Sequence, residues 1–246
     1  MTARTKTATM AHPSLKAILA ARDALGGHPE ADRVVMRTLV RRVARTRGMW
    51  PVMPGLSSVP NRASQYDMAA RLEAVDVTGW DMADLGAARE YLLTDGKRAA
   101  AGAWYTPPEV AEAMCRLSIG PQLDRLAKSD DPGDVLMVTS VDPACGAGVF
   151  LVAAARLITA AYCQREFGNA HPKLMAAVMP EVTQECVFGM DIDEVAVELA
   201  RFALWMECDG RPDFRFMDEN VCVVNPLSAP DAVPPALAKR DPRWTR

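Results

Sequence analysis

The sequence predicts an α/β fold, in which a parallel sheet of about three strands follows a helical N-terminal region. After residue 134, short apolar runs rich in β-branched residues alternate with longer helical patterns, which is typical of a parallel sheet. Before residue 98, apolar residues recur at helical spacing instead. The chain has 246 residues, half of them hydrophobic, enough for two units. We therefore expect a helical region over 1–98, an α/β domain over 99–230 and a C-terminal tail over 231–246.

The helical region contains four predicted helices. "PSLKAILAARDAL" and "ADRVVMRTLVRRVARTRG" begin at Pro13 and Ala31. Two more stretches lie near 62–75 and 81–94, after a loop rich in Pro, Gly and Ser at 50–61.

The second half contains three apolar segments that we interpret as buried strands, at 134–142, 185–191 and 212–218. A long apolar helix, "GVFLVAAARLITAAYCQ", follows the first segment, and an amphipathic helix at 193–207 follows the second. Upstream of them, Thr106 and Glu109 have the spacing of a capping box at the start of another helix.

Charge is distributed unevenly along the chain. The net charge is −3, but residues 1–48 contain ten Lys and Arg against three acidic residues. Arginines recur at helical spacing there, and such a face is able to lie along a DNA phosphate backbone. A solvated helix face is the alternative. The arginines that we expect at this contact are Arg37, Arg41, Arg42 and Arg45.

Cysteine and histidine usage argues against a metal site. The six cysteines are scattered without a C-x-x-C pair, and there are only three histidines. We expect reduced, mostly buried thiols. No apolar run reaches the length of a membrane span, and no signal-peptide pattern opens the chain, so we expect a cytoplasmic protein.

The stretch "DPACGAGVFL", residues 142–151, joins the first predicted strand to its helix. Gly146 and Gly148 allow a positive φ and a close backbone approach, and the helix start offers free N–H groups. Such a junction suits a nucleotide-like ligand at the carboxyl edge of a parallel sheet, although a tight turn without a ligand also fits. Asp191, at the end of the second strand, is able to accept hydrogen bonds from two ribose hydroxyls, and Ile192 to pack on a base.

The spacing narrows the choice of cofactor. Leu151 stands where a dinucleotide-binding loop has its third glycine, and Asp191 lies 43 residues after Gly148 rather than about 20. The lysine of an ATP-binding loop is also missing. An acid at the end of each of two strands suits S-adenosylmethionine, because Asp142 would face its positively charged methionine end.

Three motifs together resemble those of amino-methylating DNA methyltransferases. "GAWYTPPEVAEAM", "DPACGAGVFL" and "GMDIDEVAVELARFAL" stand in the order found in the adenine-N6 type, and the resemblance covers residues 100–227. It implies a Rossmann-like methyltransferase sheet, S-adenosyl-L-methionine as cofactor, DNA as substrate and a place in restriction-modification.

The resemblance also assigns roles to residues. "YTPP" is similar to a clasp over the methionine end, and "FMDEN" to a short motif that contacts the adenine of the cofactor through Asp218, with Asn220 as an alternative. Asp191 takes the ribose role and Ile192 the adenine-packing role. The cofactor-binding residues implied are Tyr105, Thr106, Pro107, Asp142, Pro143, Ala144, Gly146, Gly148, Phe150, Asp191, Ile192 and Asp218.

The motif that performs the chemistry, N-P-P followed by an aromatic residue, is not found. The nearest text is "NPLS", in which Asn225 and Pro226 are weak candidates, because the second proline and the aromatic residue are missing. We interpret it as a turn. Without the motif, adenine-N6 and cytosine-N4 chemistry are not distinguished.

Three hypotheses follow. The first is a portion of an adenine-N6 DNA methyltransferase, truncated or completed by a second polypeptide, because a first strand without a neighbour would leave an apolar open edge. The second is a non-catalytic protein that binds S-adenosylmethionine or DNA. The third, least favoured, is a Rossmann-like enzyme acting on a small molecule.

Overall fold

The computed structural model describes residues 12–53, 55–56, 58, 60–93, 106–229 and 232–240. The chain divides into two compact units, the first Met1–Gly48 with Pro54–Tyr105, the second Met49–Met53 with Thr106–Arg246. The boundary that we predict near residue 98 lies outside the described residues.

The first unit is helical, as the apolar spacing predicts. Its helices are α1 (His12–Asp23), α2 (Ala31–Thr46), α3 (Arg62–Glu73) and α4 (Met82–Leu92). The side chains of Asn61 and Asp81 accept hydrogen bonds from the first turns of α3 and α4, which fixes where both helices begin. Its core includes Val35, Leu39 and Leu72, none of which has any exposed surface.

Two of the four arginines that we expected on an open basic face of α2 do not lie on one. Arg37 is buried, with 5 % of its surface exposed. Arg42 donates to the carbonyl oxygens of Leu72 and Val75 at the end of α3, where a cation also stabilises the helix dipole. The sequence pattern was misleading because helical spacing alone cannot show which arginines have carbonyl partners. The predicted contact residues that are exposed are Arg41 and Arg45.

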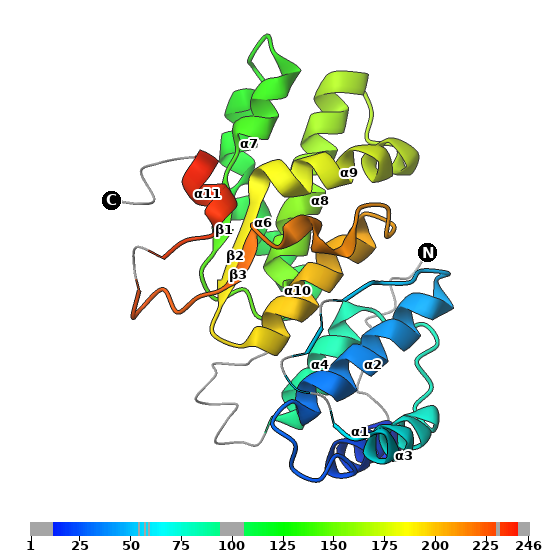
Figure 1. The fold of residues 1–246 in the computed structure, drawn as a ribbon. Coiled ribbons are helices and arrows are strands. Elements are labelled where there is room, and N and C mark those ends of the chain that lie inside the picture. The colour runs from blue at the N-terminus through cyan, green and yellow to red at the C-terminus, as the bar shows by residue number, and fades with distance from the viewer. Residues whose placement is uncertain are drawn as a thin grey trace. The chain divides into compact units, whose positions relative to one another are not determined.

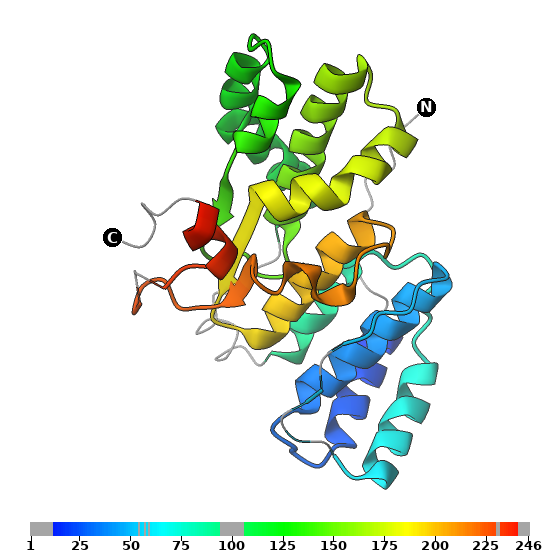
Figure 2. The ribbon, with the colours of Figure 1, turned by 45° about the horizontal axis from the view of Figure 1, so that its top comes forward.

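The second unit is built on a parallel three-stranded sheet in the order β1-β2-β3 (Figures 1 and 2). The strands are β1 (Ser140–Asp142), β2 (Val187–Asp191) and β3 (Val221–Val223). All five residues of β2 are buried, whereas all three residues of the edge strand β1 are half-buried. This arrangement confirms the predicted fold class.

Two helices connect β1 to β2, α8 (Val149–Phe167) and α9 (Pro172–Cys186), and α10 (Glu194–Glu207) connects β2 to β3. Both α8 and α10 pack on the sheet and on each other, so they cover the same face. The core between them includes Leu151, Ile158 and Leu204. Three elements precede β1 in the sequence of this unit, namely α6 (Pro108–Ser118), α7 (Gly120–Leu126) and the 3-10 helix η1 (Pro132–Met137).

The third strand was predicted in the wrong place. Residues 212–218 contain the 3-10 helix η2 (Phe214–Met217), and the strand starts at Val221. Asp213 accepts a hydrogen bond from the backbone N–H of Arg215, which starts the helical turn. Phe214 and Met217 then both point into the core at the spacing of a 3-10 turn.

Three further elements differ from the prediction. The first strand begins at Ser140, because η1 takes up residues 134–137 of the segment that was predicted as strand from residue 134. Helix α9 was not predicted. Within the predicted C-terminal tail, α11 (Pro235–Arg240) is a short helix whose Leu237 is fully buried.

None of the described helices is long and apolar enough to cross a membrane. In the described parts of the chain, no three His, Cys, Asp or Glu side chains are grouped so as to hold a metal ion. All six cysteines are free thiols, and five of them are buried.

Candidate cofactor site

The candidate site lies at the carboxyl end of the sheet, where β1 ends at Asp142 and β2 ends at Asp191. Between β1 and α8 runs the cofactor loop, which we define as residues 143–148. Two successive N–H groups attach it to β2. That of Cys145 donates to the carbonyl oxygen of Met190, and that of Gly146 donates to Oδ2 of Asp191, both over 2.8 Å. The loop and the strand end therefore form one structural unit.

Two glycines give the cofactor loop its path. Gly146 has a φ of 52° and Gly148 a φ of 88°, both in the left-handed region that favours glycine. At Gly148 the steric demand is also severe, because a Cβ would lie 2.8 Å from the Cα of Ala200 on α10. This close approach brings the start of α8 against α10 and sets the position of its N-terminal N–H groups.

Asp191 is a structural acceptor as well as a candidate ligand. Its Oδ2 accepts from Gly146, and its Oδ1 accepts from the backbone N–H of Asp193 over 2.8 Å. Each carboxylate oxygen has two lone pairs, so both retain acceptor capacity for a ligand hydroxyl. The side chain is thus fixed in orientation before any ligand binds.

Asp142 lies in a less favourable environment for its charge. Burial raises the pKa of its carboxyl group, the hydrogen bond from the N–H of Ala144 opposes this, and the charge of Asp191 raises it further. Within the described parts of the chain, no lysine or arginine forms an ion pair with Asp142 or Asp191. Two neighbouring carboxylates without a cation are complementary to a positively charged ligand.

An apolar surface lies next to these acids. Ile192 follows Asp191 directly and is 48 % exposed, and the exposed Val223 ends the adjacent strand. A large apolar side chain left exposed beside polar groups is suited to pack on a flat base. Acids, glycine loop and apolar surface together fit S-adenosylmethionine, which combines a cation, a ribose and an adenine.

The other predicted loop and clasp residues lie as follows. Pro143 and Ala144 are in the cofactor loop, and Phe150 is in the first turn of α8. Thr106 and Pro107 directly precede α6, which packs on α8 through Ala111 and Cys115. Tyr105 lies outside the described residues.

The structure does not bring Asp218 to this site. Asp218 precedes β3, at the amino end of the parallel sheet, and pairs with Arg201 over 2.9 Å and with Arg215 over 2.8 Å. Asn225 instead follows β3 at the carboxyl end, where the N–H of Val224 donates to the carbonyl oxygen of Asp191 over 2.9 Å. This placement was not predicted, because the strand was expected at 212–218, which made Asp218 appear to end it.

Asn225 also begins a turn, as predicted. Its carbonyl oxygen accepts from the N–H groups of Ser228 and Ala229, and its side-chain oxygen accepts from the N–H of Leu227 over 3.1 Å. Pro226 lies within that turn. Neither residue is followed by a second proline or an aromatic residue, so the described residues here do not form the flipped-base motif.

A parallel sheet with a glycine loop at its carboxyl end is the arrangement in which α/β folds bind nucleotide-like ligands. The model of the N-6 DNA methylase family matches residues 81–220, which is more than half of the chain. The chain therefore belongs to the N-6 DNA methylase family, as the three motifs predicted.

The chain was also compared with solved structures and with curated proteins. A solved structure of the Type IIL restriction-modification enzyme MmeI in complex with DNA is similar, with 14 % sequence identity and a TM-score of 0.49. The similarity covers 90 % of this chain and 38 % of that chain, so this chain spans well under half of that enzyme's length. No curated protein matched the sequence.

Proposed function

We propose that this chain is the S-adenosylmethionine-binding part of a DNA methyltransferase that acts on adenine N6 in a restriction-modification system. Family membership supports the reaction class. The observation that carries the cofactor assignment is the Asp142–Asp191 pair, two carboxylates that meet at a glycine loop without a cationic partner in the described structure. The proposal also places the protein in the cytoplasm, where DNA is found and six free thiols stay reduced.

S-adenosylmethionine, when bound, supplies the methyl group as an activated sulfonium. In this proposal Asp142 offers negative charge to that cation, and Asp191 accepts from the ribose hydroxyls. Ile192 packs on the adenine, and Asn225 replaces Asp218 as the polar side chain near the adenine, because it lies at the correct end of the sheet. Thr106 and Pro107, with Tyr105, are the proposed clasp.

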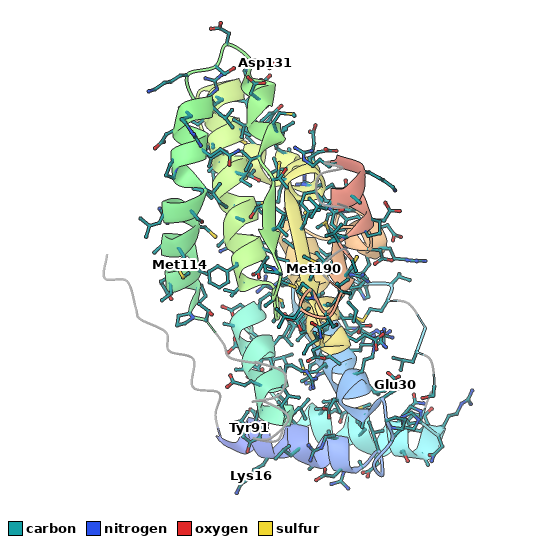
Figure 3. The ribbon with its side chains drawn as sticks, turned by 90° about the vertical axis from the view of Figure 1, so that its left-hand side faces the viewer. Lys16, Glu30, Tyr91, Met114, Asp131 and Met190 are labelled. Atoms are coloured by element: carbon teal, nitrogen blue, oxygen red, sulfur yellow. The ribbon has the colours of Figure 1, made fainter. Side chains whose placement is uncertain are left out.

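We further propose that another polypeptide completes the sheet beside β1 and supplies the flipped-base motif. The half-buried state of all three β1 residues supports this, since an inner strand of a parallel sheet is covered on every side, as β2 is. Helix α6 supports it too (Figure 3, in which Met114 is labelled). Its Val110, Met114 and Leu117 are 46 %, 52 % and 80 % exposed and recur at helical spacing, which gives an apolar stripe that the described residues of this unit leave exposed.

Calorimetric titration of S-adenosylmethionine into the purified chain tests the cofactor assignment. We expect saturable binding with one site per chain. A folded chain that does not bind would refute a site formed by this chain alone. The completion is tested by co-expression with a polypeptide that carries N-P-P-aromatic: methylation of adenine in DNA is expected only when both are present, and methylation by this chain alone would refute it.

A further inference from the structure

We propose that Gly189 is the positioning residue of the cofactor loop, an inference that rests on the proposed cofactor site. Gly189 lies in the middle of β2, two residues before Asp191. A Cβ at this position would lie 2.7 Å from Cδ1 of Leu151, 3.1 Å from Sγ of Cys145 and 3.3 Å from Cβ of Cys145. Cys145 belongs to the cofactor loop and Leu151 to the first turn of α8. Because Gly189 has no side chain, Cys145 and Leu151 are able to pack directly against the backbone of β2.

The backbone of Gly189 does not itself require glycine. Its φ is not positive, in contrast to Gly146 and Gly148, so an alanine would fit the strand conformation. The effect of a side chain at this position is therefore steric and directed at the two residues that it meets. Neither can turn away into solvent, because Cys145 is 3 % and Leu151 1 % exposed.

β2 is fixed by more interactions than the cofactor loop is. Gly189 pairs with Asp142 on one side and Val221 on the other, and its N–H donates to the carbonyl oxygen of Asn220 over 2.9 Å. An added carbon would therefore displace the loop rather than β2. The loop is attached by the two hydrogen bonds of Cys145 and Gly146, whose acceptors belong to the next two residues of β2. Displacement separates the Gly146 N–H from the Asp191 carboxylate.

The test is Gly189→Ala in the full chain, with amide hydrogen exchange and S-adenosylmethionine binding as readouts. We expect the amides of Cys145 and Gly146 to exchange at least about tenfold faster, while the interior amides of α8 and α10 keep their protection. We expect affinity for S-adenosylmethionine to fall by about tenfold or more. Gly120→Ala is the matched control, because a Cβ there has nothing within 4 Å, and it should change neither readout.

A second substitution separates positioning from stability. Leu151→Val removes the carbon atom that the new Cβ would meet at 2.7 Å. Alone it should lower the melting temperature, since it leaves space in the core, and keep loop protection and binding. In the double variant we expect loop protection and affinity to recover in part, while the melting temperature stays low. A purely structural role predicts that the double variant is worse than either single variant in every readout.

Three outcomes would overturn the inference. They are unchanged loop protection in Gly189→Ala, protection lost equally throughout the second unit, and no recovery in the double variant. If the unaltered chain does not bind S-adenosylmethionine, the proposed function of this chain alone fails. The exchange of the Cys145 and Gly146 amides still decides whether Gly189 positions the loop.

Discussion

Acidic side chains lie at both ends of the three-stranded sheet, but their hydrogen-bonding partners differ between the two ends. At the amino end, Asp218 pairs with Arg201, Glu219 with Lys239 over 2.7 Å, and Glu185 with Arg240 over 3.0 Å. At the carboxyl end, Asp142 and Asp191 accept hydrogen bonds from backbone N–H groups and form no ion pair with a lysine or arginine of the described residues.

The difference separates acids that hold the fold from acids that are available to a ligand. Arg201 shows the first role, because it also donates to the carbonyl oxygen of Val221 and so fixes the start of β3. A carboxylate whose charge is compensated by an arginine attracts a further cation only weakly. Acids held only by neutral backbone donors have no cationic side chain to neutralise them, which favours function at that end.

The largest effect is expected from Asp191→Ala. The substitution removes the proposed ribose acceptor and leaves the N–H groups of Gly146 and Asp193 without their partner, each bond to a charged acceptor being worth about 1.5–3 kcal/mol. We expect S-adenosylmethionine binding to fall by more than about a hundredfold, measured by calorimetry. Asp193→Ala, which removes the N-cap of α10, is the control and should cost about 1 kcal/mol of stability while binding persists. Binding retained by Asp191→Ala would show that the two ends do not differ as described.

Asp142→Asn should weaken binding by about tenfold, because an amide no longer attracts the cation. The same substitution should not lower stability at neutral pH, in contrast to its effect on binding. With the pKa of Asp142 raised above its ordinary value of 3.8, the folded state binds more protons than the unfolded state in the window between the two values. The free energy of unfolding therefore falls as pH rises through that window.

The uncharged amide of Asp142→Asn removes the destabilisation that the buried carboxylate causes. We expect Asp142→Asn to match or exceed the stability of the unaltered chain at pH 7, within about 1 kcal/mol, and the two to converge below the ordinary pKa. Urea unfolding at both pH values measures this. A variant that is less stable only at neutral pH would contradict the proposed environment of Asp142.

The smallest effect on cofactor affinity is expected from Asn225→Ala, and it tests whether Asn225 or Asp218 lies near the adenine. We expect Asn225→Ala to lower affinity for S-adenosylmethionine by about three- to fivefold, the loss of one neutral hydrogen bond. Asp218→Asn, at the other end, should leave affinity unchanged and lower the free energy of unfolding by about 1–3 kcal/mol, because the half-buried Arg201 loses its partner. The reverse pattern in calorimetry and urea unfolding would return the adenine role to Asp218.

The elements that the sequence predicted well have local causes. Gly146 and Gly148 have the positive φ that was predicted, and Asp142 and Asp191 end β1 and β2 as predicted, because a glycine-rich turn after an apolar run is a local signal. β2 was found because all of its residues are buried, which gives a continuous apolar run. Helix positions in the first unit followed from apolar spacing, and the caps that the structure shows at Asn61 and Asp81 start α3 and α4 close to the predicted positions.

The elements that were missed depend on tertiary context. Residues 212–218 have strand-like composition, but the Asp213 cap and the burial of Phe214 and Met217 produce a 3-10 turn. Helix α9 contains Pro180 in its interior, a residue that normally argues against a helix. The partners of Arg42 are carbonyl groups about 30 residues away, which no charge pattern can show.

The shortness of β1 has a consequence for how the chain behaves in solution. An exposed strand edge is a template on which further strands can add without limit, and proteins suppress this by keeping such edges short. Three residues offer too few backbone donors and acceptors to drive self-assembly into fibrils. For the same reason they cannot by themselves hold a complementing strand tightly. The selectivity for a completing polypeptide would therefore come from side-chain shape along α6, where Val110, Met114 and Leu117 are exposed.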